Sequence, residues 1–300
     1  MTGPQVRVLE WYGHHARALP WRAVSTTPWQ VVVSEFMLQQ TPVARVLPAY
    51  DAWVRRWPTP ASLAAAPTGE AVHAWGRLGY PRRALRLHAS ASMITDRHGG
   101  QVPLGLDELR TLPGVGEYTA AAIASFAHRQ RHAVLDTNVR RVLSRVIHGR
   151  AAAPGGLTVA ERAAAAELLP ADPEAAAQWS VAVMELGALV CTALAPSCEA
   201  CPLSSVCRWR AAGYPAPEAP RRRRPAYEGT DRQCRGRLLA VVRESPHGVG
   251  CDALEAAWAD VGQRERALDG LIADGLVQPL GDGRAALPGV ATSPHLAQDA

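Results

Sequence analysis

Apolar residues recur at helical spacing through most of this chain, in segments that Gly and Pro separate. The pattern predicts helices at about 5–18, 28–41, 43–56, 61–66, 68–77 and 80–98, with Pro48 expected to interrupt the third. It predicts further helices on both sides of a Gly-rich turn at 112–116, to about residue 147, and near 158–169 and 174–190. No strand pattern precedes residue 210, so this large part is expected to be mainly α.

The pattern changes beyond residue 212. Residues 212–232 are rich in Pro and contain Arg221–Arg224, which predicts an extended basic linker. Three helices, at about 233–243, 251–259 and 261–274, then precede a predicted β-hairpin at 275–287 that turns at Gly281–Gly283. This order of elements is typical of a winged helix. Such a module either binds duplex or serves packing alone, and the sequence leaves both roles open.

The turn at 112–116 contains Pro113, Gly114, Val115 and Gly116 between two predicted helices. Glycines permit a positive φ, and the N–H groups that open the second helix form a ready site for a phosphate. Asp136 follows at the start of the next helix, where it either takes part in chemistry or serves only as an N-cap.

A second carboxylate, Glu35, has apolar residues on both sides in a helix that is apolar on most faces. A lone buried Glu is rare. Burial raises the pKa of a carboxyl group, which prepares a protonated acid near neutral pH. The alternative is a narrow polar stripe that Glu35 shares with Gln39.

Four cysteines form the pattern C-x6-C-x2-C-x5-C: Cys191, Cys198, Cys201 and Cys207. Sets of four thiolates hold either zinc or a 4Fe–4S cluster. Zinc sites usually contain two close pairs, whereas this segment has one, so the spacing favours the cluster. Cys234 and Cys251 lie outside the pattern and are expected to be free thiols.

The composition adds a modest electrostatic argument. The net charge is +5, and all 32 basic residues are Arg, with no Lys in the chain. This charge permits a polyanionic partner without requiring one, and the Arg-only usage can simply reflect genome base composition. There is no apolar run of membrane-spanning length and no signal-peptide pattern, so we expect a cytoplasmic protein, associated with the nucleoid if bacterial.

The hairpin, the two carboxylates and the four-cysteine loop together resemble the helix-hairpin-helix DNA glycosylases, over about residues 5–212. The resemblance implies a six-helix barrel domain at 23–130 and an iron–sulfur cluster domain formed by 1–22 and 131–211, with a 4Fe–4S cluster as cofactor. Residues 233–300 would form a small winged-helix-like module. The family usually carries a larger mixed α/β domain there, which reads 8-oxoguanine.

Within the superfamily, the sequence is most similar to MutY-type adenine glycosylases. The resemblance implies that Glu35 protonates adenine and that Asp136 stabilises the oxocarbenium ion at the sugar. It implies that Tyr118 and Asn138 assist, and that Trp21 and Arg22 belong to the adenine pocket. It also implies a set of wedge or DNA-contacting residues, of which Leu78 and Tyr80 are expected to be exposed: Gln40, Thr41, Leu78, Tyr80, Gly114, Val115 and Gly116.

The implied substrate is duplex DNA with adenine opposite 8-oxoguanine or guanine, and the implied reaction is hydrolysis of the N-glycosidic bond after base flipping. Without Lys, no side-chain Schiff base can form, so we expect a monofunctional enzyme without lysine-dependent AP lyase activity. Val181 stands where the family places Gln or Glu near adenine, which leaves open a glycosylase for a mispaired or oxidised pyrimidine. A non-catalytic iron–sulfur DNA-binding regulator is the third hypothesis, which the presence of both Glu35 and Asp136 disfavours.

Overall fold

The structure, a computed structural model, describes residues 1–217 and 227–289. These residues are mainly helical, as predicted, and divide into two compact units. Unit 1 comprises residues 1–35, 103–111 and 115–222, and unit 2 comprises residues 36–102, 112–114 and 223–300. The predicted basic run Arg221–Arg224 lies outside the described residues, as does the end of the predicted module, 290–300. The domain boundaries proposed from the sequence stay a prediction.

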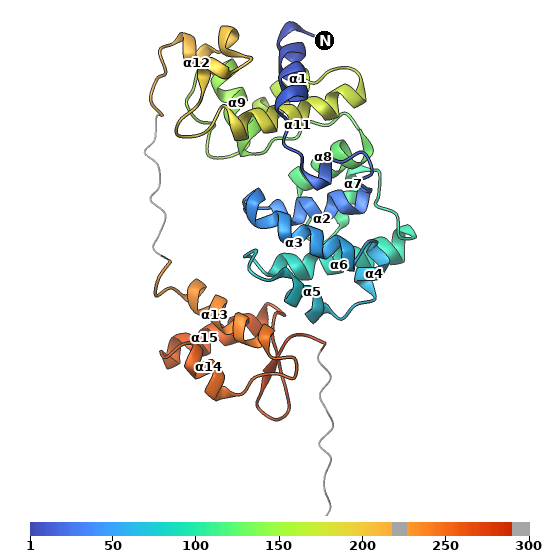
Figure 1. Ribbon diagram of the computed structural model, residues 1–300, viewed down its shortest axis with the longest axis vertical. Helices are drawn as coiled ribbons and strands as arrows, with labels where there is room; N and C mark the ends of the chain where they lie inside the picture. The colour runs from blue at the N-terminus through green and yellow to red at the C-terminus, as the bar shows by residue number, and fades with distance from the viewer. Residues whose placement is uncertain (218–226, 290–300) are drawn as a thin grey trace, which may run out of the picture. The chain divides into compact units, whose positions relative to one another are not determined.

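Unit 1 contains the N-terminal helix, the helical hairpin and the cysteine-rich loop (Figure 1). Its elements are α1 (Gly3–His15), η1 (Pro20–Arg22), most of α2 (Pro28–Leu38), α7 (Leu106–Thr111), α8 (Glu117–His128), α9 (Thr137–His148), α10 (Val159–Glu167), α11 (Pro173–Leu189), η2 (Cys198–Ala200), η3 (Ser204–Val206) and α12 (Arg208–Ala211).

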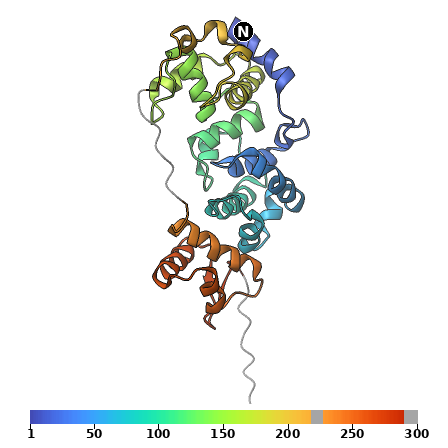
Figure 2. The ribbon, with the colours of Figure 1, turned by 60° about the vertical axis from the view of Figure 1, so that its left-hand side comes forward.

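The core of unit 1 lies where α1 and α9 pack on α11 (Figure 2). It is built from apolar side chains that include Val8, Val142 and Leu186, each at most 1% exposed. Gly187 permits the close contact of α11 with α9, because a Cβ there would lie 2.7 Å from the Cβ of Asn138. This contact brings the end of α11, just before Cys191, next to the start of α9, just after Asp136.

The helical hairpin of unit 1 is formed by α7 and α8, as predicted. At its turn, Gly114 has a φ of +85°, and a Cβ there would lie 2.9 Å from the side chains of Arg86 and Phe36. Gly116 does not use the positive φ that glycine permits, because its φ is −90°. Gly116 is the N-cap of α8, and an N-cap residue takes an extended backbone that any residue can adopt.

Unit 2 contains the rest of the large helical part and the C-terminal module. Its elements are the end of α2, then α3 (Val43–Arg56), α4 (Pro60–Ala64), α5 (Thr68–Trp75), α6 (Arg82–His98), α13 (Asp231–Glu244), α14 (Cys251–Ala257), α15 (Val261–Ala273), β1 (Gln278–Pro279) and β2 (Ala285–Ala286). The prediction that Pro48 interrupts its helix is wrong, because α3 runs through it. Pro48 is exposed, so water can bind the carbonyl that this proline leaves without an amide partner.

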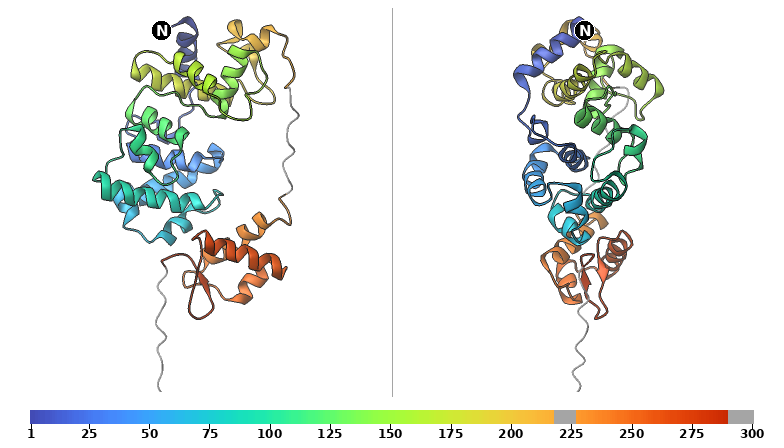
Figure 3. Two further views of the ribbon diagram at one scale, coloured as in Figure 1. Left: turned by 180° about the vertical axis from the view of Figure 1, so that it is seen from behind. Right: turned by 90° about the vertical axis from the view of Figure 1, so that its right-hand side faces the viewer.

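The C-terminal module has the predicted three helices followed by the predicted hairpin (orange to red in Figure 3). Strands β1 and β2 are antiparallel and turn at Gly281–Gly283, and Val249 pairs with Ala285 beside them. Leu238, Leu271 and Leu276 are buried in the core of the module. Its relation to winged helices stays a prediction. In the described residues, no helix is long and apolar enough to cross a membrane.

Candidate active site

Glu35, near the middle of α2, is buried, with 7% of its surface exposed. Burial and the nearby negative charge of Asp136 raise the pKa of Glu35 to about 7, although a hydrogen bond from Tyr118 and the charge of Arg22 act in the opposite direction. A substantial fraction of this carboxyl group is therefore protonated at neutral pH, and the group can act as a general acid. The predicted buried acid is present, and the alternative of a solvated polar stripe does not describe it.

Tyr118, in the first turn of α8, donates its hydroxyl to the Glu35 carboxylate. Burial and the charges of Glu35 and Asp136 raise the pKa of Tyr118 well above its usual range. The phenol therefore keeps its proton and serves as a fixed donor rather than as a base.

Asp136 is the N-cap of α9, and its carboxylate is held from two sides. Its Oδ1 accepts a hydrogen bond from the Val139 amide at 2.7 Å, and its Oδ2 accepts one from Asn138 Nδ2 at 2.7 Å. Burial raises the pKa of Asp136, and these hydrogen bonds oppose the rise. Asp136 therefore caps α9 and also lies near Glu35. The N-cap role does not exclude a role in chemistry.

Arg141 holds this arrangement from α9. Its Nη2 donates to Asn138 Oδ1 at 2.8 Å, and its Nε donates to the Cys191 carbonyl at 2.7 Å. The amide of Asn138 is thereby fixed with its NH₂ group toward Asp136. The same guanidinium connects the start of α9 with the first residue of the cysteine-rich loop.

Arg22 and Trp21 lie on η1, where Trp21 is buried. Glu185, on α11, holds Arg22 through Nη2–Oε2 at 2.9 Å and Arg17 through Nε–Oε1 at 2.7 Å. Burial alone would raise the pKa of Glu185, but hydrogen bonds from Arg17 and Arg22 outweigh it and lower the pKa to about 2. Glu185 stays charged and fixes Arg22, whose buried Nη1 has no hydrogen-bond partner within the described structure.

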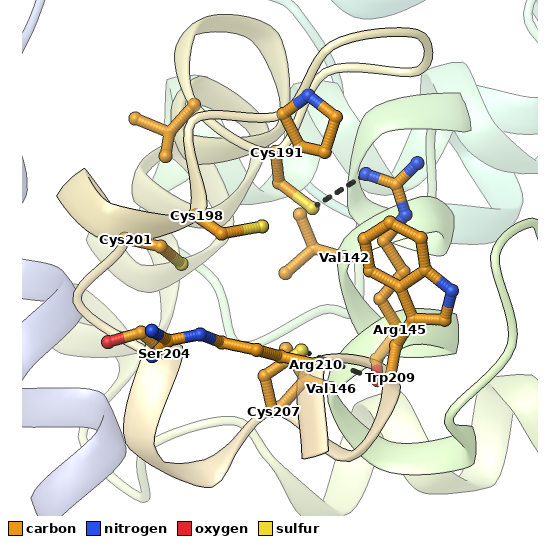
Figure 4. A pocket seen from close by; sticks show the side chains of 12 residues that line it. Val142, Arg145, Val146, Cys191, Cys198, Cys201, Ser204, Cys207, Trp209 and Arg210 are labelled. Atoms are coloured by element: carbon orange, nitrogen blue, oxygen red, sulfur yellow. Dashed lines mark hydrogen bonds between the residues drawn. The ribbon is translucent and has the colours of Figure 1, made fainter. Parts of the chain in front are cut away.

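The four predicted cysteine ligands line one pocket in unit 1 (Figure 4). Cys191, Cys198 and Cys201 lie on one side of it, and Cys207 lies across from them. Apolar groups, including Val142 and Trp209, form the rest of the wall together with Arg145. Among the described residues, no three His, Cys, Asp or Glu side chains are grouped for a single metal ion. Four thiols around one pocket match in number the ligand set of either a zinc ion or a 4Fe–4S cluster.

The cysteine-rich loop is anchored to α9 by Arg145. Its Nη1 donates to the Thr192 carbonyl at 2.8 Å and to Cys191 Sγ at 3.3 Å, and its guanidinium lies over the Trp209 ring. None of the six cysteines forms a disulfide, and the two outside the pattern, Cys234 and Cys251, are free thiols as expected from the sequence. Cys234 is buried in the C-terminal module, and Cys251 is exposed.

The predicted wedge residues of unit 2 gather around Arg83. Thr41 is buried, donates to the Leu78 carbonyl at 3.1 Å and accepts from Arg83 Nη2 at 2.8 Å. The expectation of exposure is met by Tyr80, at 53%, and is wrong for Leu78, at 3%. Gly79 between them has a φ of +81°, which turns Leu78 inward and Tyr80 outward.

Of two other predicted DNA-contacting residues, one is likewise exposed and one is buried. Gln40 is exposed in a left-handed conformation with a φ of +55°. Val115 is buried, so its side chain is not available for the predicted contact.

Comparison with known proteins identifies the family. The model of the HhH-GPD superfamily of base excision DNA repair proteins matches residues 33–155. An adenine DNA glycosylase of Mycobacterium tuberculosis is 53% identical over 294 residues, covering 96% of each chain. The chain belongs to the adenine DNA glycosylase family. A solved thermostable thymine-DNA glycosylase is 25% identical, with a TM-score of 0.62 over 69% of this chain and 95% of that one. A solved endonuclease III–DNA complex is also 25% identical, with a TM-score of 0.58 over 71% and 98%.

Three residues that hold predicted site residues in place were not found from the sequence: Arg83 in unit 2, and Arg141 and Glu185 in unit 1. Glu185 offers the same signal as Glu35, a carboxylate within an apolar helix, and could have been found by it. Arg141 lies three residues after Asn138, one turn along the same helix, but its second partner is a carbonyl 50 residues away. Val181, the departure from the family pattern, is half-buried on α11.

The ion pairs of Glu185 predict a pH-dependent stability. Because its folded-state pKa of about 2 lies below the ordinary 4.5, its contribution is complete above about pH 4.5 and is lost as the pH falls toward 2. Glu185→Gln is therefore expected to lower the free energy of unfolding at pH 7 by roughly 3 kcal/mol. The difference from the wild type should shrink between pH 4.5 and 2 in urea unfolding followed by circular dichroism.

Glu174→Gln is the matched control, because Glu174 is on the same helix but forms only an exposed ion pair with Arg129 at 3.7 Å. It should change stability little at any pH. A Glu185→Gln effect that stays constant from pH 7 to pH 2 would mean that the charge of this carboxylate does not hold Arg17 and Arg22.

Proposed function

We propose that this protein is a monofunctional adenine DNA glycosylase that hydrolyses the N-glycosidic bond of adenine opposite 8-oxoguanine or guanine in duplex DNA. The observation that carries the proposal is the pairing of Glu35, a buried carboxyl group with a pKa of about 7, with the half-buried carboxylate of Asp136. Departure of a purine needs a proton at the base and negative charge near the sugar. One acid and one carboxylate supply this division of labour.

In the proposed reaction, protonated Glu35 gives its proton to a ring nitrogen of adenine. The bond between the sugar C1′ and the base nitrogen then breaks, and its electron pair leaves with the base. The carboxylate of Asp136 stabilises the resulting oxocarbenium ion until water adds to C1′. The proton released by water returns to a carboxylate, so the products are free adenine and an abasic site.

The surrounding groups fit the positioning that this reaction needs. The unpaired Nη1 of Arg22 offers a donor to a base inserted beside Trp21, and Glu185 keeps that guanidinium in place. Base flipping needs a group that fills the gap in the stack, and exposed Tyr80 is suited to this. The N–H groups of the hairpin turn at the start of α8 can bind a backbone phosphate.

The cysteine pocket is proposed to hold a 4Fe–4S cluster through Cys191, Cys198, Cys201 and Cys207. The cluster would order the loop of residues 191–207 rather than take part in base release. Arg145 and Arg141 already fix the first turn of that loop onto α9. The loop is thereby joined to the helix that begins beside Asp136.

Base release should require Glu35 in its protonated form. Glu35→Gln is expected to slow single-turnover release of adenine by roughly 10²- to 10⁴-fold while duplex binding is retained. The wild-type rate should fall as the pH rises through about 7, because the acid is lost above its pKa. The assay uses duplexes with A opposite 8-oxoguanine, A opposite G, T opposite G and thymine glycol opposite A.

Glu10→Gln, an exposed change on α1, is the control and should retain full activity. Release of a pyrimidine alone would instead support a glycosylase for a mispaired or oxidised pyrimidine, with Val181 as the candidate cause of that specificity. If the protein binds the duplexes but releases a base from none of them, the result would support the non-catalytic DNA-binding regulator. If Glu35→Gln releases adenine at the wild-type rate, the assignment of Glu35 as the general acid is wrong.

The absence of Lys predicts that borohydride traps no side-chain imine. A Schiff base with the abasic sugar needs a primary amine, and the chain offers none on its side chains. Strand breaks should therefore appear only after alkali. Any adduct with DNA should disappear when the terminal amine is blocked, and an adduct mapped by mass spectrometry to an internal residue would contradict the prediction.

The cluster assignment predicts iron and acid-labile sulfide, rather than zinc, in anaerobically purified protein. Cys207→Ser should lose most of both, together with the visible absorption of the cluster. Cys251→Ser is the control, because this thiol is exposed and lies outside the pocket. Stoichiometric zinc in colourless wild-type protein would overturn the assignment.

A further inference from the structure

Within unit 2, the C-terminal module forms hydrogen bonds with both ends of α5. At the first turn, the Gly69 amide donates to the Pro288 carbonyl at 2.8 Å. At the last turn, Arg243 donates through Nε to the Val72 carbonyl at 3.0 Å and through Nη1 to the Gly76 carbonyl at 2.6 Å. Amides at the start of a helix and carbonyls at its end have no partner within the helix. The module therefore completes this eight-residue helix at both ends.

These contacts depend on close approach and on charge. A Cβ at position 69 would lie 2.3 Å from the Pro288 oxygen, so this contact requires glycine. Burial lowers the pKa of Arg243 to about 10, which leaves the guanidinium charged at neutral pH beside the negative end of the α5 dipole. The Arg243 carbonyl in turn lies 3.0 Å from Nδ1 of His73.

The residues that follow α5 form the turn at 76–81, which presents Tyr80 to solvent. Gly76, Gly79 and Tyr80 all have a positive φ, at +53°, +81° and +47°. Tyr80 is not a glycine, and its left-handed backbone persists only if the surroundings hold the turn. The conformation of this turn therefore depends on the groups that bind its carbonyls and flank its ends.

The turn is held from two directions. From the helical part of unit 2, Arg83 and the Trp75 indole both donate to the Gly79 carbonyl at 3.0 Å. From the C-terminal module, Arg243 binds the carbonyl of Gly76 at the start of the turn. Asp274 pairs with Arg82, directly after the turn, at 3.3 Å.

We propose that the C-terminal module positions the 76–81 turn, with Arg243 and Asp274 as positioning residues for Tyr80, and thereby sets the preference for the base opposite the excised adenine. The inference rests on the proposed function for the role of Tyr80 in DNA. The contacts between the module and the turn form without DNA, so they can be tested separately from adenine release. In this way a small module acts on opposite-base recognition through the turn, without itself touching the base.

The first test probes the contacts between the module and the turn in DNA-free, full-length protein. Arg243→Met should raise hydrogen–deuterium exchange of amides in the 76–83 segment, because the anchor of the Gly76 carbonyl is lost. Arg237→Met, an exposed change on the same helix, is the matched control and should leave that exchange unchanged. Unchanged exchange in Arg243→Met would overturn the proposal, as would an equal rise across all of residues 36–102, which would show general stabilisation only.

The second test measures single-turnover adenine release opposite 8-oxoguanine and opposite guanine. Arg243→Met should lower the preference for 8-oxoguanine by on the order of tenfold, the factor expected for one charge-assisted hydrogen bond. Asp274→Asn removes partly exposed ion pairs with Arg82 and with Arg235, so it should fold even if Arg243→Met does not, and should shift both measurements in the same direction by less.

The outcomes separate the two proposals. If the wild type releases no adenine from either duplex, the proposed function fails, while the exchange measurement still decides whether the module holds the turn. If the wild type prefers 8-oxoguanine and neither variant changes that preference, the proposed function stands and the positioning role is wrong.

Discussion

The burial of Glu35 next to Asp136 is the constraint on which the rest of unit 1 depends. Two carboxyl groups in one interior cannot both be charged without cost, so one must hold a proton or both must be compensated. Here the two environments differ. Asp136 accepts hydrogen bonds from the α9 amide of Val139 and from Asn138, whereas Glu35 accepts one from the Tyr118 hydroxyl and is more deeply buried, beside the negative charge of Asp136. This difference places the proton on Glu35 and the negative charge on Asp136. These are the states that the proposed general acid and the proposed stabiliser of the oxocarbenium ion need.

Arginine side chains bind backbone carbonyls in both units. Arg141 joins Asn138 to the Cys191 carbonyl, Arg145 binds the carbonyl of Thr192, and in unit 2 Arg83 and Arg243 bind carbonyls around the 76–81 turn. The planar guanidinium reaches two or three acceptors at fixed angles, which a single ammonium group does not. A composition that can arise from genome base content is thus used throughout the structure for a specific geometric task.

The sequence predicted most helices and the buried carboxyl group of Glu35, because both depend on local pattern. Periodicity located α2 and α9, and the position of a Glu within an apolar helix was enough to indicate a raised pKa. The sequence did not predict Glu185 as a partner of Arg17 and Arg22, since this pairing joins segments 163 and 168 residues apart. The expectation for Leu78 was wrong, because the positive φ of Gly79, which turns two neighbouring side chains to opposite sides, leaves no periodic signal.

Tyr118 places a phenol, and no amine, beside the two carboxyl groups. A lysine at this position would place a nucleophilic amine near the sugar and open a path through an imine. The tyrosine places a phenol there, whose pKa is raised by burial and by the two carboxylates, so it stays protonated and donates to Glu35. The same contact lowers the pKa of Glu35 and offsets part of the rise caused by burial. The phenol at position 118 therefore offers no amine nucleophile, and its hydrogen bond also tunes the pKa of Glu35.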